Sequence, residues 1–137
     1  MRKILVLVLL GLVSMMALAA CSGGGSTAAG PGDVARGKGL YNQKTLGPKS
    51  TEGCVSCHVY DESGGKAEKA PYTKGTGTRA ASRVPGMSAE AYVRESIVKP
   101  DAYVVEGFNK GDMYQFWEKD LTPQQMNDLI AYILSEK

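Results

Sequence analysis

The residues best suited to chemistry form one short stretch, Cys54-Val55-Ser56-Cys57-His58. On one helical turn, side chains at positions i and i+3 lie on the same face, so both cysteine sulfurs can reach the two vinyl groups of one porphyrin. His58 follows directly and can bind the iron through a neutral ring nitrogen. The spacing therefore predicts a c-type haem attachment site, with one covalent haem c as the cofactor.

Two other chemistries could use the same side chains. A thioredoxin-like dithiol usually lies near a βαβ pattern, and no such pattern is evident in this sequence. A structural zinc ion needs four ligands from cysteine and histidine. The chain after residue 32 offers only Cys54, Cys57 and His58 for that purpose. Haem attachment is therefore the favoured interpretation.

The iron of a porphyrin has a second axial position, and His58 is the only histidine in the chain. Methionine is the obvious remaining ligand, and His/Met ligation raises the reduction potential. Met126 falls on the apolar stripe of the last expected helix, where we expect it to pack in the core. Met113 lies in an expected loop that can reach the far side of the haem. We therefore favour Met113 over Met87, which comes just before a helix.

Two more residues are expected to serve the haem. A ligating imidazole usually donates its second N–H to a carbonyl or carboxylate, and the carbonyl of Pro71 is our candidate acceptor for His58. Arg79 is a candidate partner for a haem propionate, because a guanidinium suits a carboxylate. The plain alternatives are a proline that only makes a turn and an arginine that is only solvated.

The elements that must position these residues are expected to be helices. Asp33 is a suitable N-cap for a helix over residues 34–44, in which Gly37 would allow close approach of the last helix near Tyr132. No convincing strand is found, so the predicted class is all-α.

Two later helices have clear start signals. Ser88 is expected to open a helix to about Val98, which Pro100 stops. Thr122-Pro123-Gln124-Gln125 is a capping box with proline at the first helical position, and it predicts a helix to about Ser135. Residues 75–79 are predicted to form a flexible polar connection.

The N-terminus has the pattern of an export signal. Residues 1–20 combine a basic start, a short apolar run and a small-residue end. Leu18-Ala19-Ala20-Cys21 resembles the lipobox of bacterial lipoproteins, so Cys21 is expected to carry acyl chains and to anchor the protein. The alternative is an ordinary signal peptide that ends in cysteine. Residues 21–32 then form a flexible tether, and residues 33–137 form the folded domain.

Charge and cysteine usage agree with this division. Removing residues 1–20 takes two of the 16 basic side chains and leaves 14 basic and 14 acidic ones. No basic patch indicates a nucleic-acid partner. One cysteine would carry lipid and two would carry haem, which leaves none for a disulfide. Haem c is attached outside the cytoplasmic membrane, so we expect a lipid-anchored protein on the extracytoplasmic, periplasmic face of a bacterial cell membrane.

Over about residues 32–136 the chain resembles the class I mono-haem cytochromes c. This resemblance implies a small fold in which an N-terminal helix crosses a C-terminal helix around one haem. Tyr114 departs from the pattern of related cytochrome domains of oxidases and quinol-oxidising complexes, in which proline usually follows the ligand methionine. The resemblance rests on the first helix with Gly37 and Tyr41, the Cys54–His58 site, Ala70-Pro71, the stretch 92–108, Met113 and the closing helix with Ala131-Tyr132-Ile133.

The stretch Tyr103-Val104-Val105-Glu106-Gly107-Phe108 is similar to cytochrome domains attached to bacterial haem-copper oxidases. It is also similar to lipoprotein subunits of quinol-oxidising complexes such as alternative complex III. The resemblance implies an electron-transfer protein rather than an enzyme, acting in a respiratory or photosynthetic chain. The expected partners are redox proteins at the haem edge near Cys54 and Cys57, the membrane, and a larger membrane complex. The alternative is a ligand-binding module or peroxidase with an open iron, which would lack a distal histidine.

Overall fold

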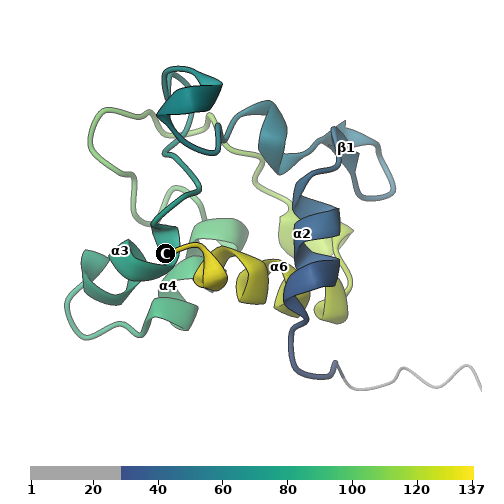
Figure 1. The fold of residues 1–137 in the computed structure, drawn as a ribbon. Helices are drawn as coiled ribbons and strands as arrows, with labels where there is room; N and C mark the ends of the chain where they lie inside the picture. The colour runs from purple at the N-terminus through teal and green to yellow at the C-terminus, as the bar shows by residue number, and fades with distance from the viewer. Residues whose placement is uncertain (1–28) are drawn as a thin grey trace, which may run out of the picture.

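The computed structural model describes residues 29–137, and the structural statements below concern those residues. Five helices and a small antiparallel sheet surround a central core, and Figure 1 shows α2 lying across α6. The mostly helical architecture confirms the predicted all-α class. The elements are α2 (Val34–Tyr41), β1 (Thr45–Leu46), β2 (Thr51–Glu52), the 3-10 turns η1 (Cys54–Ser56) and η2 (Glu62–Gly64), α3 (Thr76–Arg83), α4 (Ala89–Val98), α5 (Trp117–Asp120) and α6 (Pro123–Ser135).

The predicted helix starts are confirmed by their caps. The Asp33 side chain accepts a hydrogen bond from the Arg36 amide, and Ser88 accepts one from the Ala91 amide. At α6 both halves of the capping box between Thr122 and Gln125 are present. Each cap satisfies amides that have no partner within their helix, which is why these short polar residues mark the boundaries.

Three sequence predictions about local structure were wrong. The first helix ends at Tyr41 rather than at residue 44, because the chain turns there into the β1–β2 hairpin. The hairpin itself was not expected, since strands of two residues are too short to show an alternating pattern. Residues 75–79, predicted as a flexible connection, contain the start of α3.

The unexpected helix α3 depends on glycine for packing. Gly77 lies in the segment predicted to be a flexible connection and has a low helix propensity, but a Cβ at this position would overlap the carbonyl oxygen of Leu134 in α6. The Gly77 amide also donates a hydrogen bond of 2.8 Å to the carbonyl of Glu136. The missing side chain thus lets α3 lie directly on the end of α6, and tertiary contact outweighs the weak helix propensity.

The crossing of α2 and α6 is a backbone contact at Gly37. A Cβ on Gly37 would overlap the Asp128 carbonyl oxygen and lie 2.8 Å from Cβ of Tyr132. One turn further along α2, the ring of Tyr41 packs on that of Tyr132 with centroids 5.2 Å apart. The close approach expected from Gly37 is therefore confirmed.

Asp128 is the polar centre of this crossing. Its Oδ1 accepts hydrogen bonds from the Asp33 amide at 2.8 Å and from Gln124 at 2.9 Å. The Arg36 guanidinium donates from Nε to Oδ2 at 2.8 Å and from a terminal nitrogen to Oδ1 at 3.0 Å. This paired geometry holds the pKa of Asp128 at about 2, below its ordinary 3.8.

The segment ahead of α2 is also fastened to α6. The Gly30 amide donates to Gln124 at 2.7 Å, and Asn127 donates to the Gly30 carbonyl at 2.9 Å. Gln124 also donates to the carbonyl of Pro31 at 3.2 Å. Residues 30–32, placed by the sequence in a flexible tether, therefore lie against α6. The predicted signal over residues 1–20, Cys21 and the tether up to residue 28 lie outside the described residues.

The hydrophobic core includes apolar side chains of α4 and α6, and Met126 is buried in it as predicted. Within residues 29–137, no helix is long and apolar enough to cross a membrane. The buried members of the core are Tyr41, Leu46, Ala80, Tyr92, Val93, Ile97, Trp117, Leu121, Met126, Leu129, Ile130 and Tyr132.

Two glycines of α2 provide a matched test of the crossing. Gly37→Ala should destabilise the haem-loaded protein by about 3 kcal/mol, because backbone rather than a movable side chain blocks the new methyl group. Gly39→Ala has open space around its Cβ and should stabilise the protein by roughly 0.5–1 kcal/mol through helix propensity. Urea unfolding of both variants measures this difference. Equal effects would contradict backbone contact at Gly37.

Asp128→Asn should lower the free energy of unfolding by about 2 kcal/mol at neutral pH, since it removes hydrogen bonds to a charged group. Because folding lowers the pKa of Asp128 from 3.8 to about 2, its ionised form stabilises the fold above about pH 4. That advantage should shrink as the pH falls from about 4 towards 2. Urea unfolding across this range measures the difference from wild type, with the exposed Glu68→Gln as control. A difference independent of pH would contradict the assignment.

Candidate haem-binding site

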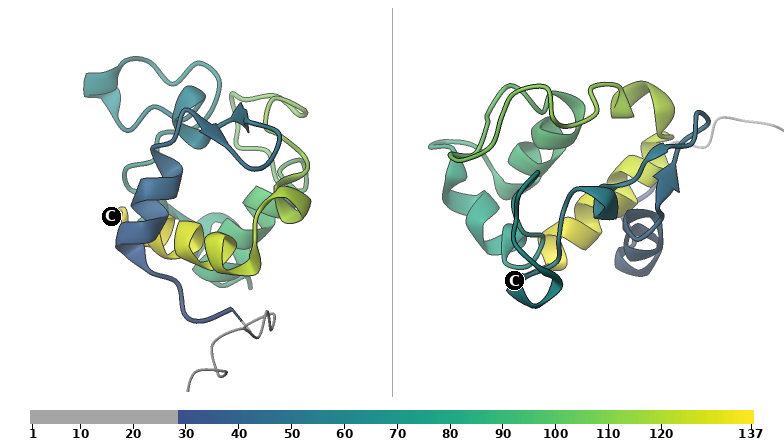
Figure 2. Two further views of the ribbon diagram at one scale, coloured as in Figure 1. Left: turned by 90° about the vertical axis from the view of Figure 1, so that its right-hand side faces the viewer. Right: turned by 90° about the horizontal axis from the view of Figure 1, so that it is seen from above.

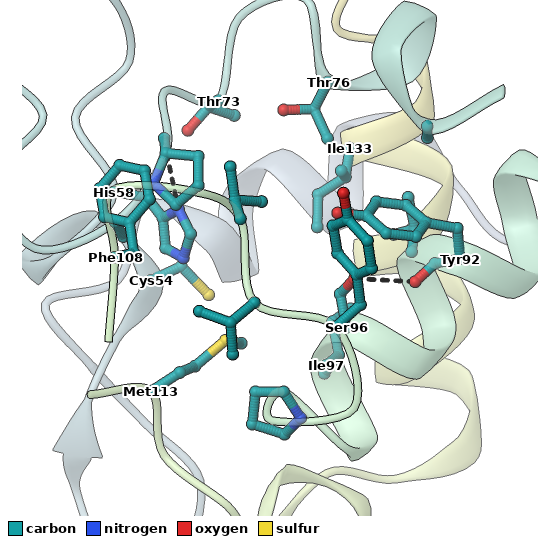
Figure 3. A pocket seen from close by; sticks show the side chains of 18 of the residues that line it. Cys54, His58, Thr73, Thr76, Tyr92, Ser96, Ile97, Phe108, Met113 and Ile133 are labelled. Carbon is teal, nitrogen blue, oxygen red and sulfur yellow. Dashed lines mark hydrogen bonds between the residues drawn. The ribbon is translucent and has the colours of Figure 1, made fainter. Parts of the chain in front are cut away.

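A mostly apolar pocket lies between α3, α4, α6 and the loop that joins α4 to α5, and Figure 3 shows it from close by. A second hollow adjoins it and shares Cys54, His58 and Met113 with it. Cys57 and the half-exposed Phe116 line this second hollow. The space around the Cys54–His58 turn is therefore open on one side to solvent and closed on the other by the core.

The predicted attachment residues form a tight turn. The Cys54 carbonyl accepts from the Cys57 amide at 3.2 Å and from the His58 amide at 2.8 Å. Gly53 precedes the turn, and its amide bonds to the Lys44 carbonyl at 2.8 Å, which ties the turn to the β1–β2 hairpin. Cys54 and Cys57 are free thiols, neither of which is in a disulfide.

The His58 ring is held by the backbone of a distant segment. Its Nδ1 lies 2.9 Å from the Pro71 carbonyl, where a protonated Nδ1 donates. Burial lowers the pKa of His58, and the Pro71 carbonyl opposes that shift only in part. The imidazole is therefore held neutral with Nδ1 engaged. Its other nitrogen faces the pocket, on the side where the sulfurs of Cys54 and Met113 lie (Figure 3).

The environment of Cys54 opposes the dithiol alternative. Burial raises the pKa of the Cys54 thiol to about 11. A dithiol oxidoreductase instead needs a thiol whose pKa is lowered, so that the thiolate can attack. For the zinc alternative, residues 29–137 contain no cluster of three or more Cys, His, Asp or Glu side chains that could hold a metal ion.

The three candidate methionines occupy different environments. Met113 is half-buried in the loop between α4 and α5 and lines both hollows. Figure 3 shows its side chain entering the pocket from the side opposite His58. Met87 packs against the hydrophobic core just before α4 and is not among the residues lining this pocket, while Met126 is inside the core. Of the three, only Met113 shares the pocket with His58.

Arg79 lines the pocket, but its guanidinium already has protein partners. It donates to the carbonyls of Tyr72 at 2.8 Å and Lys74 at 2.9 Å, and to the Thr76 hydroxyl at 3.1 Å. These bonds tie the chain ahead of α3 to the helix. A contact between Arg79 and a propionate stays a prediction.

Several lining residues were not singled out in the sequence. Arg83 and Thr76 reach the pocket from α3, which was not recognised as a helix, and Thr73 is bonded to the hydroxyl of Tyr41 in the pocket wall. The loop residues Tyr103, Val104, Val105 and Phe108, which the sequence singled out for their family resemblance but not as pocket residues, close another side. The signal that could have predicted their place in the pocket wall is a run of apolar and aromatic residues inside a loop, because such side chains are usually buried against the protein or a bound group.

These residues fit a c-type haem. Two free thiols and a neutral imidazole lie on one turn, a thioether lies across the same pocket, and the remaining wall is largely apolar. Thiol, imidazole and thioether are the groups that attach and ligate haem c.

A family model for cytochrome c matches residues 34–137. The chain belongs to the cytochrome c family. This cytochrome c therefore has one covalent c-type haem as its cofactor and is a haem-based electron-transfer protein. The comparison with curated proteins returned no match.

Proposed function

We propose that this cytochrome c is a membrane-tethered carrier of single electrons whose haem is attached at Cys54 and Cys57 and ligated by His58 and Met113. The observation that carries the proposal is that one pocket receives both the imidazole and the thioether. When bound, the haem supplies the one-electron change between Fe(III) and Fe(II). With His58 and Met113 both bound to the iron, no site would be left for a substrate, which favours electron transfer over a peroxidase or gas-binding role.

Each protein group then has a defined task. The Pro71 carbonyl fixes the tautomer and orientation of His58 and makes the imidazole a better ligand. The apolar side chains of α4 and α6 exclude water, and the thioether of Met113 raises the reduction potential. Arg79 lies at the pocket with its guanidinium fixed by backbone carbonyls and is our candidate for a propionate contact.

A redox partner is proposed to dock over the hollow lined by Cys57 and Phe116, where the haem edge would be nearest to solvent. Phe116 is 51% exposed there, and Lys119 lies over its ring at 5.6 Å. Electron-transfer contacts of this kind are small and transient, so one exposed aromatic residue is a suitable centre.

The tether is proposed to run from a lipidated Cys21, after removal of residues 1–20, to Gly30 on α6. Residues 21–29 could then span at most about 30 Å from the membrane surface. The described chain begins beyond one end of α2, and β1 lies beyond the other (Figures 1 and 2). The attachment turn follows that hairpin, so it would face away from the anchor on the extracytoplasmic side.

The parent system is proposed from the resemblance of residues 103–108. That stretch favours a subunit or close associate of a quinol-oxidising complex such as alternative complex III, or of a haem-copper oxidase. A tether holds a carrier beside its donor and acceptor at high effective concentration.

Intact-mass measurement of the protein made in its own host tests haem and anchor together. The mature chain should begin at Cys21, carry the mass of one haem and of acyl chains, and have no titratable thiol at Cys54 or Cys57. A mass with the haem but without acyl chains would contradict only the anchor. Two free thiols and no haem would contradict the whole proposal.

Met113→Ala should lower the midpoint potential, because a thioether ligand raises it, and should open the iron to carbon monoxide. Met87→Ala is the matched control and should leave both properties unchanged, since Met87 packs on the core beside α4. Redox titration and visible spectra with carbon monoxide measure the two effects. If Met87→Ala opened the iron and Met113→Ala did not, the ligand assignment would be wrong.

A further inference from the structure

Tyr114, the residue directly after Met113, is anchored to a buried carboxylate. Its hydroxyl donates to Oδ2 of Asp120 at 2.6 Å, and the Asp120 side chain is only 6% exposed. The Tyr114 ring packs edge-on against Trp117 with centroids 4.9 Å apart. Trp117 is buried and also lines the pocket. The hydroxyl of Tyr114 is therefore held by a hydrogen bond, and its ring is held by packing against the core.

The same carboxylate reaches a second part of the site. Nζ of Lys49, in the turn between β1 and β2, lies 3.4 Å from Oδ1 of Asp120. Strand β2 leads directly into Gly53 and the attachment turn. Tyr114, Asp120 and Lys49 thus link the loop that carries Met113 to the hairpin that leads into Cys54, and we name this set the Tyr114 bridge.

The charge state of the bridge suits this task. The hydrogen bond from Tyr114, with the nearby charge of Lys49, holds the pKa of Asp120 below its ordinary value, although burial opposes it. Asp120 is therefore an anion that accepts a hydrogen bond from Tyr114 and forms an ion pair with Lys49. A hydrogen bond to a charged group is stronger than one between neutral groups. Lys49 is 66% exposed, so the bond from Tyr114 is the main contribution.

We propose that Tyr114 is a positioning residue, which through the Tyr114 bridge keeps the thioether of Met113 in reach of the haem iron. The inference rests on the proposed ligation by Met113. A loop that is held at the residue next to the methionine has fewer conformations with the thioether displaced. The anchored side chain of Tyr114 therefore restricts the position of Met113.

The test is the affinity of the oxidised, haem-loaded protein for imidazole, which must displace Met113 to bind. Tyr114→Phe keeps the ring on Trp117 and removes only the hydroxyl. If the bridge holds the ligand, the population with a displaced thioether rises, and imidazole should bind about ten-fold more tightly. The weak Fe–S absorption band of the oxidised protein should weaken in parallel.

Tyr60→Phe is the matched control. The Tyr60 hydroxyl also donates to a carboxylate, that of Glu136 at 2.8 Å, but on the exposed surface and without lining either hollow. A role in stability alone would shift the urea midpoint of Tyr114→Phe and leave its imidazole affinity equal to that of Tyr60→Phe. That result would overturn the inference.

Two further variants keep the result decisive. Asp120→Asn weakens the acceptor, should raise imidazole affinity in the same direction, and replaces Tyr114→Phe if that variant does not fold. Met113→Ala should bind imidazole most tightly of all. If it binds imidazole no better than wild type, ligation by Met113 fails and the inference with it. If Met113→Ala opens the iron while Tyr114→Phe and Asp120→Asn behave as wild type, only the inference fails.

Discussion

The structure depends on the backbone contact between α2 and α6. Because Gly37 has no side chain, α2 lies directly on the Asp128 carbonyl, and the Asp128 side chain binds Arg36 and the amide ahead of the helix. This contact sets the direction in which the chain leaves α2. The β1–β2 hairpin and the attachment turn follow within a few residues, so their position relative to the core is set by the same crossing.

The pocket is assembled from segments far apart in the chain. The imidazole of His58 is oriented by the carbonyl of Pro71, whose segment is in turn held by Arg79 at the start of α3. α3 can lie there only because Gly77 allows contact with the end of α6. One face of the pocket is therefore supported by hydrogen bonds to backbone carbonyls and by helix packing, which hold the His58 ring in one orientation.

The opposite face is a loop, and loops are the more mobile part of most folds. Here the loop is stiffened by side chains, since Tyr114 bonds to the buried Asp120 and packs on Trp117. A carrier of single electrons needs both faces to remain in place while the charge of the iron changes. Two different devices serve this requirement, a backbone carbonyl for His58 and a side-chain anchor beside Met113.

The sequence alone predicted Cys54, Cys57 and His58 as the attachment site, and it correctly placed the capped starts of α2, α4 and α6 and the buried Met126, because these depend on neighbours within one turn of the chain. It also selected Met113 and Pro71 as candidates, by counting the remaining side chains and through family resemblance. The hairpin, α3, the contacts of Arg79 and the Tyr114 bridge could not be predicted from it. The strands of the hairpin are only two residues long, the contacts of Gly77 with Leu134 and of Lys49 with Asp120 join distant parts of the chain, and local propensity at Gly75 and Gly77 pointed the wrong way. Only the tertiary structure decided them. Glycine has a low helix propensity within its local sequence, but its missing side chain allows close contact once a second helix packs against it.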